Sequence, residues 1–127
     1  MNEVAEARRI LSADASGGRV ETLMLEGELD VAALEQVCAE LARKLQLGVR
    51  QVVVDFNEVA HLDYRGVQPL MARAELFRRA GGDIKLSGLS PYLAAIFRAA
   101  GAHDRFEAYP HMNDARAAFA LMRAPFV

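Results

Sequence analysis

A carboxylate and an imidazole lie close together in the stretch HLDYRG, residues 61–66, where one residue separates His61 from Asp63. Asp55 comes shortly before them, and Asp30 lies much earlier in the chain. These residue types can move protons or bind a metal ion, so the group could serve a hydrolase or a metal-dependent enzyme. Their spacing, on an expected strand and the loop after it, matches no recognised ligand or acid–base motif. We therefore predict no catalytic residues, no metal site and no cofactor, and keep an enzyme using these four residues as the weakest alternative.

Arg65 is a second chemical feature of this stretch, because it stands where a helix begins. Pro69 limits the start of that helix, since a proline is tolerated only among the first helical residues, whose N–H groups have no internal partner. The helix therefore begins close to Gly66, with Arg65 at its N-terminus. A helix N-terminus favours acceptors and negative charge, so an arginine there loses about 0.5 to 2 kcal/mol relative to a capping side chain.

Local stability thus does not explain Arg65, and two interpretations stay open. In the first, Arg65 presents its planar guanidinium to a carboxylate, a carbonyl or a bound phosphate of a partner. In the second, the arginine arose by drift after regulation was lost, and its side chain is simply solvated. Tyr64 is similarly ambiguous, since it can pack on the loop or anchor an interface, where tyrosine is enriched.

The elements that position this stretch can be traced from the N-terminus. Residues 7–13 and 20–27 are apolar segments separated by a turn-forming cluster at 14–18, so we expect a hairpin. Asp30 is suited to cap a helix whose apolar residues recur at spacings of three and four and which Gly48 ends. The apolar face of this helix comprises Leu34, Val37, Cys38, Leu41 and Leu45.

Strands and helices alternate in the second half of the chain. Residues 50–56 contain an unbroken run of valines, which is typical of a central strand buried on both faces. A helix, a short strand, a helix that Ser90-Pro91 begins, a last strand and a terminal helix follow. Their expected positions are Gly66 to Gly81, 83–86, Ser90 to Gly101, 106–109 and 113–123. The core face of the helix that Ser90 begins is expected to carry Tyr92 or Leu93, followed by Ile96, Phe97 and Ala100.

This order, ββαβαβαβα, predicts an α/β fold. Strands that alternate with helices pair in parallel through crossovers, and the opening hairpin adds one antiparallel strand at the N-terminus. We therefore expect a mixed, mostly parallel sheet with about four helices. No linker or repeat divides the chain, so we predict a single domain over residues 1–127, with 1–6 as a candidate disordered segment. Whether 123–127 pack on the domain is left open.

Composition restricts the function classes further. The 127 residues are 53% hydrophobic and 25% charged, with a formal net charge of -2, so no positive excess favours nucleic acid or anionic lipid. Cys38 is alone, which excludes an internal disulfide and fits a reducing compartment as an inert core thiol. The chain lacks the apolar core of a signal peptide and any apolar run of membrane-spanning length. We predict a cytoplasmic protein without direct membrane insertion.

Three local patterns, together with the element order, resemble the STAS domain, a family named for sulfate transporters and anti-sigma-factor antagonists. The first is Gly27-Glu28-Leu29-Asp30 at the exit of the second strand. The second is VVVDFNEVAHLDYRG, residues 52–66, which ends in Asp-x-x-Gly before a helix, and the third is GGDIKLSGLSPYLAAIFRAAG, residues 81–101. The resemblance covers nearly the whole chain.

The resemblance also implies a function and a site. In the bacterial antagonist branch the second pattern reads Asp-Ser-Ser/Thr-Gly, and a partner kinase phosphorylates the residue before the glycine. Here Asp63 and Gly66 match, whereas Tyr64 and Arg65 replace the hydroxyl residues. We therefore expect a non-catalytic module that binds an anti-sigma factor or a serine-kinase-like ATPase and is not switched by phosphorylation at Arg65. The expected partner-binding residues are Asp30, Asp63, Tyr64, Arg65, Gly66 and Arg73.

An alternative partner comes from the same resemblance. Small STAS subunits support the ATPase of lipid or other membrane transporters, and they dock through the second helix and the loop before it. Kinase control does not define them, so the lost hydroxyl favours this alternative. Asp30 is expected to cap its helix in either case, and a contact between Asp30 and Arg65 stays open.

Overall fold

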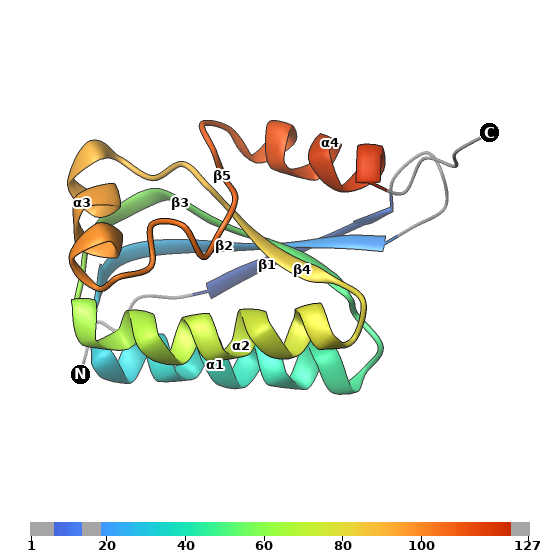
Figure 1. Cartoon of the computed structure of the whole chain (residues 1–127), viewed down its shortest axis with the longest axis horizontal. Coiled ribbons are helices and arrows are strands. Elements are labelled where there is room, and N and C mark those ends of the chain that lie inside the picture. Colours follow the sequence, from blue (N-terminus) through green and yellow to red (C-terminus); the bar gives the residue numbers. More distant parts are fainter. Residues whose placement is uncertain (1–6, 14–18, 123–127) are drawn as a thin grey trace.

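The computed structural model describes residues 7–13 and 19–122, with side chains described for residues 19–120. Its strands form one sheet in the order β1-β2-β3-β4-β5, in which β1 is antiparallel to β2 and the other neighbours are parallel (Figure 1). The mixed, mostly parallel sheet with an antiparallel N-terminal strand is therefore confirmed. The strands are β1 Ala7–Ala13, β2 Arg19–Leu29, β3 Gln51–Leu62, β4 Asp83–Ser87 and β5 Ala108–Tyr109.

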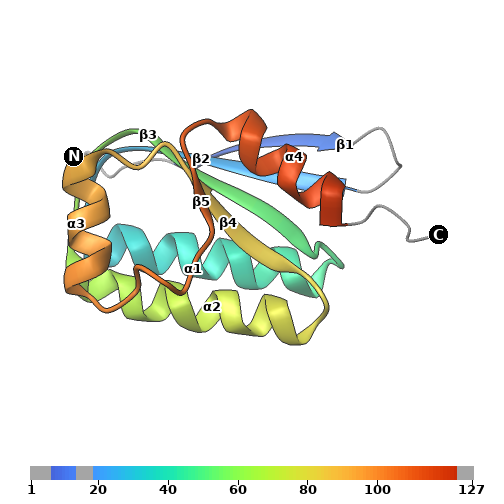
Figure 2. The same cartoon turned by 45° about the horizontal axis from the view of Figure 1, so that its top comes forward.

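Helices cover both faces of the sheet and one of its ends. α1 and α2 lie side by side on one face, α4 lies on the other, and α3 stands at the end where α2 begins (Figures 1 and 2). A short 3-10 turn, η1, leads directly into α2. Within the described residues the helices are α1 Val31–Gln46, η1 Tyr64–Gly66, α2 Val67–Arg79, α3 Pro91–Ala99 and α4 Met112–Met122.

Several expected boundaries differ from the observed ones. The valine strand does not end at residue 56 but continues to Leu62, because β2 is long enough to pair with it as far as Leu29↔Leu62. The last strand is confined to Ala108–Tyr109, because these two residues pair with Leu86 and Ser87 at the end of β4. The terminal helix begins at Met112. Its predicted last residue, the turn at 14–18 and the segments 1–6 and 123–127 lie outside the described residues.

The valine run of β3 serves two cores, as the sequence predicted. Val52 and Val54 belong to the larger apolar cluster, which α1, α2 and α3 share with the sheet. Val53 points to the opposite face, where it meets Ala115 and Phe119 of α4. Successive side chains of a strand alternate between faces, so an unbroken apolar run requires cover on both. β3 is accordingly the middle strand of the sheet.

A buried ion pair, which the sequence did not reveal, joins α1 to the sheet. The ammonium group of Lys44, near the end of α1, donates a hydrogen bond to the carboxylate of Glu21 on β2, and both residues are buried. Glu40, one turn earlier on α1, lies 3.8 Å from the same ammonium group. A buried charge that loses its partner is strongly destabilising, whereas an apolar pair of similar volume is tolerated.

We predict that Lys44→Met lowers the free energy of unfolding by about 3 kcal/mol, because it leaves the Glu21 carboxylate buried without its partner. The double variant Glu21→Leu, Lys44→Met should recover most of this loss, since it removes both charges. Urea unfolding followed by circular dichroism measures both values. A double variant as unstable as the single one would contradict the prediction.

Candidate functional site

The loop from Asp63 to Gly66 is held at both of its ends by backbone hydrogen bonds. The N–H of Asp63 donates to the carbonyl of Leu29 at 2.9 Å, which ties the loop to the exit of β2. The N–H of Gly66 donates to the carbonyl of Asp63, also at 2.9 Å, and closes the 3-10 turn. The ends of β2 and β3 therefore fix the place where α2 begins.

Asp63 and Arg65 form a closed pair within this loop. The Oδ1 atom of Asp63 accepts the backbone N–H of Arg65 at 2.9 Å and its Nε–H at 3.0 Å. The Oδ2 atom accepts Nη2–H of the same guanidinium at 2.7 Å. Two parallel bonds between a guanidinium and a carboxylate give a defined orientation to both groups. The side chain of Arg65 is thus held in place although it is 69% exposed.

This pair corrects one expectation from the sequence. We expected Arg65 to lack an acceptor for the helix donors and to place an uncompensated cation at the helix N-terminus. Asp63 supplies both missing parts, because its carboxylate caps η1 and neutralises the guanidinium. Ion pairs this exposed contribute little to stability, so the pair orients the loop more than it stabilises the fold.

The pair also changes the acidity of Asp63. Its side-chain hydrogen bonds from Arg65, followed by the bond from the backbone N–H of Arg65, lower the pKa of Asp63 from 3.8 to about 2. Asp63 is consequently ionised throughout the range in which proteins are usually studied. Its negative charge and the positive charge of Arg65 are both permanent features of the surface.

Gly66 allows α2 to begin directly against α1. A Cβ atom at this position would lie 2.3 Å from Cδ1 of Leu34, which is far inside van der Waals contact. The φ of Gly66 is -82°, a value that any residue adopts, so close approach explains this glycine and backbone freedom does not. The predicted site residue Gly66 is therefore buried, and its contact with Leu34 of α1 positions the loop.

A hollow of about 370 Å³ lies between this loop and α3, and we call it the Tyr64 hollow. Tyr64 on one side and Tyr92 on the other are 58% and 54% exposed. The hydroxyl of Tyr92 and Nδ1 of His61 lie 2.5 Å apart in a hydrogen bond whose donor depends on the histidine tautomer. The hollow therefore combines an ion pair with two accessible aromatic rings. Its lining residues are His61, Leu62, Asp63, Tyr64, Arg65, Tyr92 and Ile96.

The other two predicted partner-binding residues lie outside this hollow. Asp30 is the N-cap of α1 and accepts the N–H of Ala33 at 2.8 Å, as its position in the sequence indicated. The hydrogen-bond partner of the Arg65 guanidinium is Asp63 and not Asp30. Arg73 is half-buried further along α2, close enough to α1 for its charge to act on the Cys38 thiol, whose pKa is raised chiefly by burial.

The four residues that suggested an enzyme do not form one group, because only His61 and Asp63 line the Tyr64 hollow. Asp55 is buried within β3. Its carboxylate accepts hydrogen bonds from the hydroxyl of Ser87 at 2.6 Å and from the backbone N–H of Asn57 at 3.3 Å. His61 faces Tyr92 instead. Among the described residues, no three His, Cys, Asp or Glu side chains are grouped so that they could hold a metal ion.

Sequence reasoning missed the contribution of α3 to this site. Tyr92 competed with Leu93 for the core face, and the structure buries Leu93 and exposes Tyr92. A signal was present, because Leu93 and Phe97 fall on one helical face, whereas Tyr92 lies one turn before Ile96 on its flank. That α3 stands beside the loop could not be read from this pattern.

Comparisons with known proteins agree with this architecture. Residues 17–115 match the STAS domain family. A curated relative, BtrV of Bordetella bronchiseptica, a candidate anti-sigma factor antagonist, is 30% identical over 95 residues, which span 75% of this chain and 82% of the relative.

Two solved structures share the fold at lower identity. An anti-sigma factor antagonist from Mycobacterium paratuberculosis has a TM-score of 0.73 and 18% identity, covering 91% of this chain and 95% of its own. A sulfate transporter family protein from Wolinella succinogenes has a TM-score of 0.67 and 19% identity, covering 87% and 90%. In the part of the chain that the structure describes, none of the helices is both long and apolar enough to cross a membrane.

We predict that Arg65→Gln returns the pKa of Asp63 toward its ordinary value of 3.8, because the charged hydrogen bonds that lower it are removed. A carboxylate with a depressed folded pKa stabilises the fold above its unfolded pKa and loses this effect as the pH falls. In the wild type that loss falls between about pH 4 and pH 2. Carbon-detected NMR titration of the Asp63 carboxyl group measures both values, and equal midpoints would contradict the assignment.

Gly66→Ala should lower the free energy of unfolding by about 1 to 3 kcal/mol, because its Cβ would force Leu34 or the start of α2 to move. Gln68→Ala, at an exposed position of the first turn of α2, is the matched control and should change stability by less than about 0.5 kcal/mol. Urea unfolding distinguishes them. A Gly66→Ala variant as stable as the control would show that the contact with α1 yields easily.

Proposed function

Because the chain belongs to the STAS domain family, we propose that it is a cytoplasmic protein-binding module of the anti-sigma-factor-antagonist kind, without catalysis of its own. The relative BtrV supports this branch of the family. The observation that carries the proposal is the Tyr64 hollow, in which two exposed tyrosines flank a loop held rigid by hydrogen bonds.

The chemistry of the hollow suits a protein partner. Tyrosine and arginine are enriched among the residues that dominate binding energies, because they bury a large area and retain polar groups. Tyr64 and Tyr92 can be buried by a partner without disturbing the core, since both rings already stand outside it. A loop that is already ordered loses little conformational entropy when it binds.

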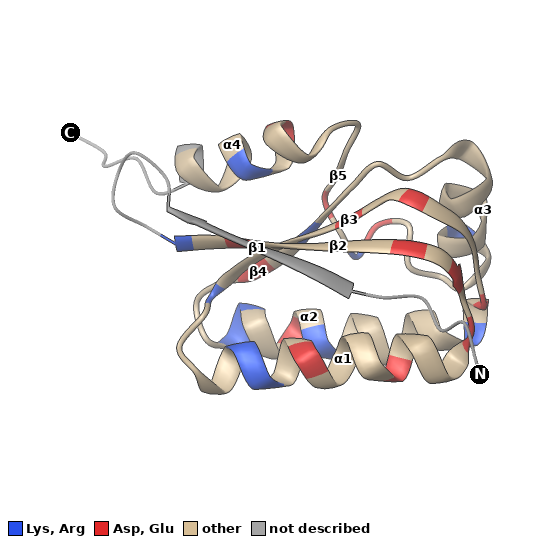
Figure 3. Ribbon diagram, turned by 180° about the vertical axis from the view of Figure 1, so that it is seen from behind, with Lys and Arg blue, Asp and Glu red and all other residues tan. Residues whose placement is uncertain are grey.

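Charged groups around the Tyr64 hollow can orient a bound partner. Asp63 and Arg65 present one fixed negative and one fixed positive group side by side, and Asp30 adds an exposed carboxylate at the start of α1. Acidic residues also follow β2 and β3 toward this end of the sheet (Figure 3). Charge patterns of this kind favour one partner orientation over others. Arg73, further along α2, forms the outer part of the proposed surface.

The same geometry supports a binding state that phosphorylation at residue 65 does not control. A guanidinium has no hydroxyl to accept a phosphoryl group, and its positive charge is opposite to that of a phosphate. Tyr64 does not replace the acceptor, because the kinases of the family act on serine or threonine. We assign the partner as an anti-sigma factor or a serine-kinase-like ATPase that is bound constitutively.

A second candidate is the STAS subunit of a membrane transporter, which would use the same surface on a transporter ATPase. The absence of a phosphoacceptor at Arg65 favours this candidate, because kinase control is not the defining feature of such subunits. The likeness to the Wolinella succinogenes protein supports the fold alone.

The test is capture of partners by the immobilised full chain from a lysate of the source organism, followed by affinity measurement with the partner that is recovered. Arg65→Glu should weaken binding more than about tenfold, or 1.4 kcal/mol, because it puts a second carboxylate next to Asp63. Tyr64→Ala should act in the same direction. Arg79→Glu, a charge reversal at the exposed far end of α2, is the matched control and should leave the dissociation constant unchanged.

The identity of the partner separates the candidates. Specific recovery of an anti-sigma factor or a related kinase supports the antagonist function, and recovery of a transporter ATPase supports the second candidate. Equal affinities for the wild type and Arg65→Glu would refute the Tyr64 hollow as the binding surface.

A further inference from the structure

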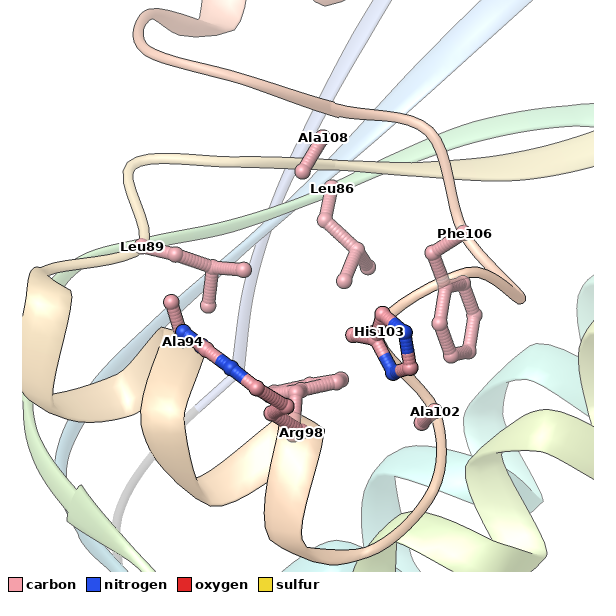
Figure 4. A pocket seen from close by; sticks show the side chains of 9 residues that line it. Leu86, Leu89, Ala94, Arg98, Ala102, His103, Phe106 and Ala108 are labelled. Carbon is pink, nitrogen blue, oxygen red and sulfur yellow. The ribbon is translucent and has the colours of Figure 1, made fainter.

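A second hollow lies against a different face of α3, between this helix, the end of β4 and β5. It has a volume of about 280 Å³, and we call it the Arg98 hollow (Figure 4). Seven of its nine lining residues are apolar, and the other two are Arg98 and His103. The residues proposed to bind the protein partner do not line it, so its function can be considered independently.

The walls of this hollow are apolar and firmly packed. Leu86 of β4 is fully buried behind it. The rings of Phe97 and Phe106 meet edge to face with centroids 5.9 Å apart, and Phe56 supports Phe97 from behind at 5.7 Å. Edge-to-face contacts of this kind are favourable beyond the area that they bury. Packing with the core therefore holds the aromatic wall of the hollow in place.

Small side chains leave the space open. Three alanines line the hollow at positions where larger side chains would fill it: Ala94 on α3, Ala102 in the loop after α3, and Ala108 on β5. The hollow is partly open to solvent, and water against its apolar walls finds few hydrogen-bond partners. Covering these walls with an apolar group would release that water at a gain proportional to the area covered.

Two basic side chains are available to such a group. Figure 4 shows Arg98 and His103 beside the apolar lining, Arg98 from α3 and His103 from the loop that follows it. Within the described ranges the guanidinium of Arg98 forms no hydrogen bond or ion pair, in contrast to Arg65 and Arg78, which bind carboxylates. No carboxylate lines the hollow, so a positive charge stands there without a counterion.

We propose that the Arg98 hollow binds a small carboxylate with an apolar chain or ring of about eight carbon atoms. A volume of about 280 Å³ lies near the lower end of the range of small-molecule sites, about 300 to 1,000 Å³, and therefore suits a small ligand. The apolar part lies against Phe97 and Phe106, and the carboxylate accepts hydrogen bonds from Arg98 and His103. A guanidinium matches a carboxylate through two parallel bonds, which makes this head group a better fit than an uncharged one.

Alternative occupants fit these features less well. A bare inorganic anion would pair with Arg98 but leave the apolar walls wet, and a neutral hydrocarbon would leave the guanidinium unpaired. Ligand sites of proteins typically combine an apolar lining with a few polar groups that orient the ligand, and this hollow has that composition. The basic side chains and the apolar walls of the hollow together therefore define the class of ligand.

The test is an amide NMR titration of the full chain with octanoate as the probe. We expect saturable shifts at the residues that line the Arg98 hollow, with a dissociation constant of about 1 mM or lower. Arg98→Gln should weaken octanoate binding about fivefold or more, and octanol should bind the wild type correspondingly more weakly. Arg79→Gln removes a comparably exposed arginine elsewhere and should have no effect.

A second variant tests the apolar part of the site. Ala94→Leu should reduce octanoate binding by filling the hollow, and its thermal unfolding curve shows whether the fold is retained. The proposal is overturned if octanoate causes no saturable shifts, if the shifts lie away from the lining of the Arg98 hollow, or if Arg98→Gln binds as tightly as Arg79→Gln. It is also overturned if a side chain of a protein partner is found to occupy the Arg98 hollow and octanoate does not compete with that partner for binding.

Discussion

The hydrogen bonds made by Asp63 are the constraint on which the site depends. Its backbone N–H is bound by Leu29 at the end of β2, its carbonyl accepts the N–H of Gly66, and its carboxylate holds Arg65. One residue thus joins the sheet, the start of α2 and the arginine at the N-terminus of that helix. Arginine is tolerated at a helix N-terminus here because a carboxylate two residues earlier compensates its charge.

α3 is the second organising element, because it forms a wall of both hollows. Tyr92 and Ile96 face the Tyr64 hollow, whereas Ala94 and Arg98 line the other. Ser90 fixes where this helix begins by accepting the N–H of Leu93 at 3.1 Å. A short helix with a defined start can therefore present an interface residue on one face and ligand-binding residues on another.

Much of the architecture was predictable because it follows local rules. Asp30 and Ser90 cap helices as short polar residues do, and the valine run of β3 required apolar cover on both faces. The site was only partly predictable. Asp63, Tyr64 and Arg65 were identified as surface residues of one loop. Tyr92 was one of two candidates for a core position and was not assigned to the site, since its role depends on where α3 docks.

The sequence by itself determined the order of elements, their caps and the absence of a hydroxyl at Arg65, since each depends on neighbouring residues. Tertiary structure alone decided that Asp63 and not Asp30 binds Arg65, that Lys44 reaches Glu21 across the core, and that Asp55 turns to Ser87. These pairings join groups by the direction of side chains and the docking of helices on the sheet. Their energies depend on distance and burial, and neither quantity is contained in residue spacing.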